Sequence, residues 1–218
     1  MSAQASLRLR DHAYSNFTAK LLSRDIQPGQ IVSQRELVEL TGMPLGAIRE
    51  MIPRLEADGL IKTVPKRGLQ ILSIDLELVR NAFQLRSIIE GEAVMAFCKT
   101  ATSDDIDRLI RQHQDVRDAA TSAVSPDILQ KAQQIDWDFH DLIIDAMGNA
   151  IISDIHRVNA IKIRLIRNQD TRMLPELVVS VLDEHLVILA ALKERDVEGA
   201  VRALQAHIDS AKRRALGM

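Results

Sequence analysis

The chain of 218 residues has little cysteine, few aromatic side chains and no long apolar run. Cys98 is its single cysteine, so a disulfide within the chain is excluded and a reducing compartment is expected. No uncharged apolar run approaches the roughly 18 residues that a membrane-spanning helix needs, and the first residues lack the apolar core of a signal peptide. We therefore expect a cytoplasmic protein without a membrane partner.

Aromatic residues make up only 3% of the chain, so Leu, Ile, Val and Ala supply most of its apolar mass. This balance favours packed helices over a β-sandwich. The net charge is −2, which gives no general attraction to nucleic acid. The charge is unevenly distributed, however, because residues 1–75 carry 10 Lys+Arg against 8 Asp+Glu, whereas residues 76–218 carry 18 against 22. The first part of the chain is therefore compatible with DNA binding.

The first 75 residues show helical spacing followed by strand-like alternation. Ser33 and Glu36 are placed to form a capping box that opens a short helix, and Gly42 ends it because glycine accepts the left-handed conformation. We interpret residues 26–31 as a turn between short apolar pieces. The expected elements are helices over residues 7–24, 33–40 and 44–57 and strands over 60–64 and 69–72, with a basic turn over 65–68.

The rest of the chain has helical signals and no strand signal. The expected helices cover residues 76–99, 103–121, 126–147, 150–169, 175–194 and 197–215. The sequence thus predicts a mainly α protein in two domains. Residues 1–74 would form a winged helix-turn-helix, and residues 75–218 an antiparallel all-α bundle of about six helices.

Basic residues gather where a winged helix-turn-helix contacts DNA. Arg35 begins the first helix of the motif, and Arg49 lies on the polar side of the second. Lys66 and Arg67 form the hairpin tip, where Gly68 lets the backbone approach closely. Recognition helices place their N-terminal residues against base edges while flanking cations contact phosphates. The alternative is a purely structural motif with solvated charges.

A second group of residues has the chemistry of a metal site. Asp136 and His140 are four positions apart, so they share one face of a helix. His185 and His207 each lie within a later helical segment among apolar neighbours. Three imidazoles and one carboxylate suit a borderline divalent ion such as zinc, nickel or manganese. The alternative is that each histidine is a packed or surface residue, which spacing alone does not exclude.

The first domain resembles the DNA reader of GntR-type regulators. The similarity lies in Ser-Gln-Arg-Glu-Leu from Ser33, Ile-Arg-Glu from Ile48, residues 55–61 and Pro-Lys-Arg-Gly from Pro65. The resemblance implies operator contacts by Arg35, Arg49 and residues 66–68. Where the family has a Ser/Thr-Arg-Thr-Pro-like run, this chain has Pro44-Leu45-Gly46-Ala47. Leu45 then replaces a base-reading arginine and could contact a thymine methyl instead, beside Gly46.

The second domain resembles the FCD effector domain of FadR-type GntR regulators, in its six-helix VanR-like branch. The similarity lies in residues 85–93, 136–143, 183–185 and 206–207. It implies that Asp136, His140, His185 and His207 hold a metal, most simply zinc. It also implies that Arg86, with Glu90, faces the effector cavity and pairs with a carboxylate. An Arg86–Glu90 salt bridge is the alternative for that pair. Three further histidines match no ligand position and are expected at the surface or in packing: His12, His113 and His156.

The sequence therefore predicts a homodimeric transcriptional regulator, and specifically a repressor. Its partners would be double-stranded operator DNA and a small carboxylate metabolite bound beside the metal. The rival is a metalloenzyme with an accessory winged helix, in which Glu184 or Asp138 would act as base. A protein-interaction module is a third reading. We favour a regulator that is not an enzyme, because the chain has no Gly-rich phosphate loop and no nucleophile motif.

Overall fold

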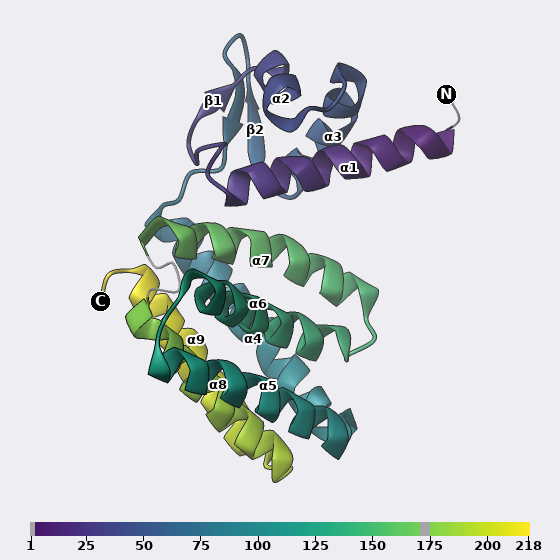
Figure 1. The fold of residues 1–218 in the computed structure, drawn as a ribbon. Coiled ribbons are helices and arrows are strands. Elements are labelled where there is room, and N and C mark those ends of the chain that lie inside the picture. Colours follow the sequence, from purple (N-terminus) through teal and green to yellow (C-terminus); the bar gives the residue numbers. More distant parts are fainter. Residues whose placement is uncertain (1–2, 171–174) are drawn as a thin grey trace. The chain divides into compact units, whose positions relative to one another are not determined.

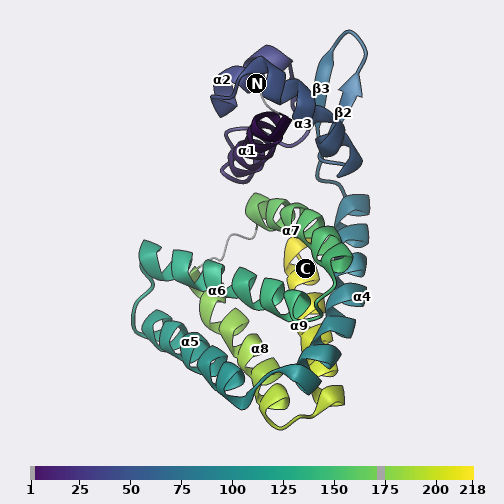
Figure 2. The same cartoon turned by 90° about the vertical axis from the view of Figure 1, so that its right-hand side faces the viewer.

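The structure is a computed structural model that describes residues 3–170 and 175–218 (Figures 1 and 2). The chain divides into two compact units, Met1–Asp75 and Leu76–Met218. None of the described helices is both long enough and apolar enough to cross a membrane.

The first unit is a winged helix-turn-helix. Its elements are α1 (Ala3–Leu22), β1 (Ile31–Val32), α2 (Gln34–Thr41), α3 (Leu45–Ala57), β2 (Ile61–Val64) and β3 (Gly68–Ile71). The three antiparallel strands lie in the order β1-β3-β2. The sequence predicts a turn over residues 26–31 and gives no sign of β1, because two residues are too few for an alternating pattern. The strand exists because Ile31 and Val32 pair with Gln70 and Leu69 of β3.

Local signals explain why the helices of this unit begin and end where they do. The Ser33 hydroxyl accepts a hydrogen bond from the Glu36 amide at 3.1 Å, and the Glu36 carboxylate accepts one from the Ser33 amide at 2.6 Å. Gly42 ends α2 with a φ of 68°. Helix α3 continues through Pro53, whose ring faces solvent. The buried core joins all the helices to the sheet through Phe17, Leu21, Leu37, Ile48, Leu55 and Ile71.

The second unit is an all-helical bundle. Its described residues form α4 (Leu76–Thr100), α5 (Ser103–Ser122), α6 (Pro126–Asp145), α7 (Ala150–Asp170), α8 (Pro175–Lys193) and α9 (Val197–Ala215). Helix α4 packs against α9, α7 and α6, and α8 packs against α5 and α9, as Figure 2 shows. Ser125 and Pro126 start α6 in the expected way, since the Ser125 hydroxyl caps the Ile128 amide and Pro126 occupies the first turn. This arrangement confirms the predicted fold class.

Two glycines of the first unit predict stability changes of opposite sign. Gly68 has a φ of 121°, and a Cβ there would lie 2.7 Å from the Val32 carbonyl oxygen. Gly68→Ala should therefore destabilise the sheet by about 1–3 kcal/mol. Gly46 is helical with open space around its Cβ position, so Gly46→Ala should stabilise α3 by up to about 1 kcal/mol. Hydrogen exchange of amides in residues 3–72 measures both, and unchanged protection in Gly68→Ala would contradict the close approach.

Candidate metal centre and nucleic-acid-binding surface

The residues predicted to bind DNA lie on the surface of the first unit. The Arg35 side chain on α2 is 91% exposed. Arg49 on α3 is also exposed, and its Nε donates to the Gln34 side chain at 3.2 Å. Leu45 and Gly46 are exposed at the first turn of α3, where a recognition helix meets base edges. Leu45 is 40% exposed, so part of its side chain is accessible to a partner at this end of α3.

The wing holds its cations in a turn between β2 and β3. Lys66 has a φ of 64°, a left-handed conformation that costs a non-glycine residue about 1–2 kcal/mol. Arg67 follows, and its amide donates to the Val64 carbonyl at 3.0 Å, which closes the turn. Both side chains are exposed. The turn therefore presents two adjacent positive charges to solvent, as a phosphate-binding wing requires.

In the second unit, the four predicted metal ligands converge on one point. Asp136 and His140 come from α6, His185 from α8 and His207 from α9, and each offers a ligand atom within 4.8 Å of the others. His185 Nε2 lies 3.5 Å from Asp136 Oδ1 and 3.4 Å from His207 Nε2. Ligand atoms 2.0–2.1 Å from zinc at tetrahedral angles lie roughly 3.4 Å apart. The spacing therefore fits an ion at the centre.

The outer nitrogen of each of the three histidines has its own contact. His207 Nδ1 donates to Glu184 at 2.8 Å, and Arg214 donates to both oxygens of that carboxylate. His140 Nδ1 lies 2.8 Å from Glu90 Oε2. His185 Nδ1 contacts the His113 ring, as described below. Metal-binding histidines are oriented in this way, through the nitrogen that does not bind the ion.

The protonation states of these side chains also suit a metal ion. Burial lowers the pKa of His207 to about 4 and that of His185 well below its usual value, so both rings are neutral at pH 7. Burial alone would raise the pKa of Asp136, but Arg167 and the neighbouring histidines together outweigh burial, lower the pKa and keep the carboxyl ionised. Asp136 Oδ1 is buried, and no residue that the structure describes is a hydrogen-bond partner for it. A divalent cation would satisfy that oxygen, so the residues present fit one.

A pocket borders this cluster between α4, α6 and α7. Arg86 reaches it from α4, where its Nε donates to Glu90 at 2.8 Å and its Nη2 to His140 Nε2 at 2.6 Å. The Arg86 Nη1 atom is buried and has no hydrogen-bond partner within the described part of the chain. Arg86 thus forms the salt bridge to Glu90 and also faces the cavity, so the two alternatives left open by the sequence are compatible. A carboxylate would satisfy its remaining N–H groups.

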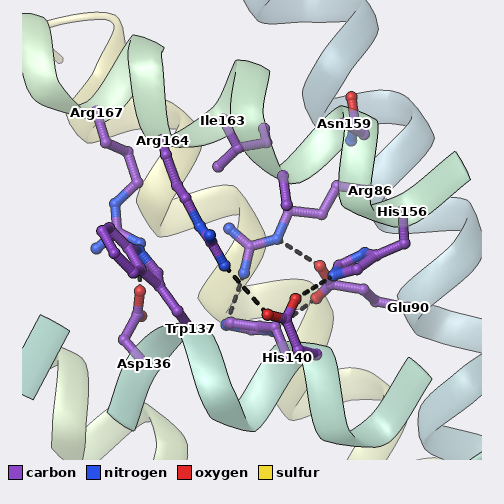
Figure 3. Close-up of a pocket in the computed structure, with 12 residues that line it drawn as sticks. Arg86, Glu90, Asp136, Trp137, His140, His156, Asn159, Ile163, Arg164 and Arg167 are labelled. Atoms are coloured by element: carbon purple, nitrogen blue, oxygen red, sulfur yellow. Dashed lines mark hydrogen bonds and ion pairs between the residues drawn. The ribbon is translucent and has the colours of Figure 1, made fainter. Parts of the chain in front are cut away.

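Helix α7 supplies pocket residues that sequence analysis missed. Figure 3 shows Arg164 and Arg167 pointing from α7 toward α6, where Asp136 and Trp137 lie. Arg167 pairs with Asp136, and the Arg164 guanidinium lies 4.3 Å from the centre of the Trp137 ring. The remaining α7 residues of the wall include His156, Asn159 and Ile163. No sequence motif identifies these α7 residues as pocket residues, although apolar and basic residues recur along α7 at helical spacing.

The free space in the pocket is small. The centre of a water molecule can reach about 30 Å³ of it, which is room for a few atoms. A bound metabolite would therefore have to displace side chains or extend toward solvent.

The remaining polar candidates occupy different surroundings. His12 is exposed on α1, and His156 is buried beside Asp141 at 3.0 Å. Burial alone would raise the pKa of Glu184, but hydrogen bonds from His207 and Arg214 bring it down to about 2, which makes this carboxylate a weak base. Asp138 is exposed and accepts from Gln134. Neither acid lines the pocket beside the cluster, as a base of the rival metalloenzyme would.

A winged helix-turn-helix joined to a helical domain with a buried ligand cluster defines a class of two-domain regulatory DNA-binding proteins. Residues 9–71 match the bacterial regulatory proteins of the gntR family, and residues 81–210 match the FCD domain. The chain belongs to the GntR family, in the group whose second domain is an FCD domain.

Individual relatives are distant but extend over most of the chain. The probable HTH-type transcriptional regulator LgoR of Escherichia coli K12 is 23% identical over 200 residues, which cover 90% of this chain and 64% of LgoR. The chain thus spans less than two thirds of LgoR. The HTH-type transcriptional repressor RspR of the same strain is 26% identical over 196 residues, or 87% of this chain and 83% of RspR. These names are those of regulators, so the metalloenzyme reading is not retained.

A solved structure shares the whole fold. A putative GntR transcriptional regulator from Rhodococcus sp. RHA1 aligns over 99% of both chains with a TM-score of 0.72 and 17% identity. At this identity the likeness concerns the fold alone.

The buried histidines predict an acid-sensitive second unit in the metal-free protein. Below pH 6.5 the His207 ring takes up a proton in the unfolded chain. In the folded protein the buried ring, with its pKa of about 4, stays neutral. The free energy of unfolding is therefore highest above pH 6.5 and decreases as the pH falls toward 4. His207 alone accounts for about 3 kcal/mol of this decrease. Urea unfolding in chelator, followed by Trp137 fluorescence, measures this loss.

Two glutamine variants isolate the origin of the acid sensitivity. His207→Gln should flatten the pH dependence, whereas His12→Gln at the exposed surface of α1 should leave it unchanged. An identical slope in His207→Gln and the natural protein would contradict the assignment.

Proposed function

We propose that this protein is a DNA-binding transcriptional repressor whose operator affinity is controlled by a small carboxylate metabolite bound beside a divalent metal. The observation that carries the proposal is the cluster itself. Four buried ligand atoms face one another, and a buried arginine with an unpartnered N–H lies directly beside them. Such a cluster is costly to bury without a cation, and Arg86, although paired with Glu90, keeps one buried nitrogen for a further acceptor.

The DNA-binding part of the proposal is supported by the exposed cations of the first unit. Arg35 and Arg49 lie on the two helices of the motif, and Lys66 and Arg67 lie in the wing. The arginines suit base or phosphate recognition, and the wing cations suit the phosphate backbone. Leu45 at the start of α3 would contact a thymine methyl, so the operator should differ from those read by an arginine at that position.

For the metal, zinc is our first choice. Three imidazole nitrogens and one carboxylate oxygen are ligands that zinc accepts in four-coordinate sites, and nickel or manganese would accept the same set with further ligands. In a six-coordinate ion two positions remain for water or for an effector carboxylate. One observation links the proposed metal and the proposed effector. Arg86 Nη2 donates to the same His140 Nε2 lone pair that the ion needs. Metal binding would therefore release Arg86 toward the pocket, where it can hold the effector.

We further propose a homodimer, because a symmetric protein reads the two halves of a near-palindromic operator with two identical wings and recognition helices. RspR is named a repressor, which supports repression rather than activation by this protein.

The first prediction from this proposal concerns DNA. Arg49→Ala should weaken operator binding by about 1–3 kcal/mol and relax sequence preference if Arg49 reads a base. Lys66→Gly preserves the left-handed turn but removes the charge, so it should weaken binding to all sequences and reduce the salt slope by about one. Titrations of the DNA upstream of the protein's own gene, at several salt concentrations, measure both.

The control for these titrations is Lys99→Ala, which removes an exposed lysine from the second unit and should bind DNA normally. Normal binding by both the Arg49 and Lys66 variants would show that residues 33–68 are not the DNA surface.

The second prediction separates metal from effector. His185→Ala and His207→Ala should each lose the metal, melt at lower temperature and show a blunted carboxylate response, while binding operator without effector. Arg86→Lys keeps the charge but loses the planar fork, so it should retain metal and lose the response. Elemental analysis, melting curves and DNA titrations with a panel of mono- and dicarboxylates measure the three properties. Unchanged metal content in either histidine variant would remove that residue from the site.

A further inference from the structure

His113 on α5 lies outside the predicted ligand set but is joined to it. Its side chain is buried, with 1% of the residue exposed. Nδ1 lies 2.7 Å from the carbonyl oxygen of Leu109, one turn earlier in the same helix. Nε2 lies 3.2 Å from Nδ1 of His185 on α8. A chain of three groups therefore runs from the α5 backbone to a proposed metal ligand.

The protons of this chain can be assigned from its first member. A carbonyl oxygen only accepts, so His113 Nδ1 must carry the hydrogen. A neutral imidazole has one N–H, which makes His113 Nε2 an acceptor. His185 Nδ1 must then carry a hydrogen and donate it. The remaining nitrogen, His185 Nε2, has a free lone pair, and this atom is the one that faces Asp136 and His207.

Packing holds the two rings in this relation. The Phe139 ring lies edge-on to His113, with centroids 5.5 Å apart and an interplanar angle of 80°. The same phenyl ring lies 4.8 Å from His185 at 39°. The two imidazoles are themselves 5.3 Å apart. Rotation of His113 about its ring bond would therefore break the hydrogen bond and disturb Phe139 together.

The other two histidine ligands are held differently. His140 and His207 each contact a carboxylate, Glu90 and Glu184 respectively, through Nδ1. Only an acceptor can occupy such a position if Nε2 is to bind a cation. At His185 the acceptor is an imidazole, and an imidazole accepts there only because its own proton is committed to the Leu109 carbonyl.

We propose that His113 is a positioning residue for the metal centre, which fixes the tautomer and ring orientation of His185 so that Nε2 is available as a ligand. This proposal rests on the proposed metal site and adds a fourth histidine to its three histidine ligands. A histidine that merely fills space between α5, α6 and α8 would not need the Leu109 contact or a particular tautomer.

Two substitutions in the full-length protein separate positioning from packing. His113→Leu fills the apolar space without hydrogen bonding, and His113→Gln places an amide oxygen near the Nε2 position with an N–H beside it. Zinc affinity, measured by competition with a chromophoric chelator, should fall about 10–100-fold in His113→Leu and recover most of that loss in His113→Gln. The absorption spectrum of bound Co²⁺ should change in His113→Leu and return toward that of the natural protein in His113→Gln. Natural affinity and spectrum in His113→Leu, or no recovery in a folded His113→Gln, would overturn the proposal.

A measurement on the natural sequence keeps the proposal testable even where a variant fails to fold. In metal-free protein, ¹⁵N chemical shifts of the imidazoles should show His113 and His185 both protonated at Nδ1. Protonation of His185 at Nε2 would overturn the proposal. Failure of the natural protein to bind zinc would instead refute the proposed metal site. The two failures can be told apart, because the tautomers are measured in metal-free protein.

Discussion

The second unit depends on the burial of four polar ligand groups where three helices meet. Asp136 and His140 on α6, His185 on α8 and His207 on α9 leave their ligand atoms facing one another with almost no exposed surface. Apolar side chains there would pack without cost, whereas neutral imidazoles and an ionised carboxylate need partners. Glu184 and His113 supply hydrogen-bond partners for the outer nitrogens of His207 and His185, and Glu90 lies 2.8 Å from that of His140. A cation at the centre would meet the inner atoms, where it would compete with Arg86 for His140 Nε2.

In the proposed function, Arg86 would connect metal binding to effector binding. Its guanidinium is shared between Glu90, His140 and the pocket, so an ion that takes the His140 nitrogen changes what Arg86 can hold. The proposed metal and effector would then be coupled through one side chain, and such a coupling is reciprocal for their affinities. Control of the operator would further require two states of the proposed dimer that the effector distinguishes. Those two states would differ in the distance between the two DNA-binding surfaces, which are formed by the exposed cations of each first unit.

Sequence predicted the elements whose signals are local. The capping box at Ser33, the glycine stop at Gly42 and the helical spacing after residue 75 identify the helices, and the resemblance to FCD domains brought the four ligands together before any geometry was known. Strand β1 was missed because its pairing with β3 is not local. The α7 side of the pocket and the role of His113 were missed for a related reason. Both arise from contacts between helices far apart in the chain, which spacing along one helix does not record.

X-ray absorption at the zinc edge of the zinc-loaded protein shows directly which side chains bind the ion. We expect scattering from nitrogen and oxygen at 2.0–2.2 Å, with the multiple-scattering signature of three imidazoles and no sulfur. In Asp136→Asn, where one ligand is weakened, the three-imidazole signature should persist. A shell of oxygen atoms with fewer than two imidazoles, or sulfur from Cys98, would place the metal elsewhere and contradict the account.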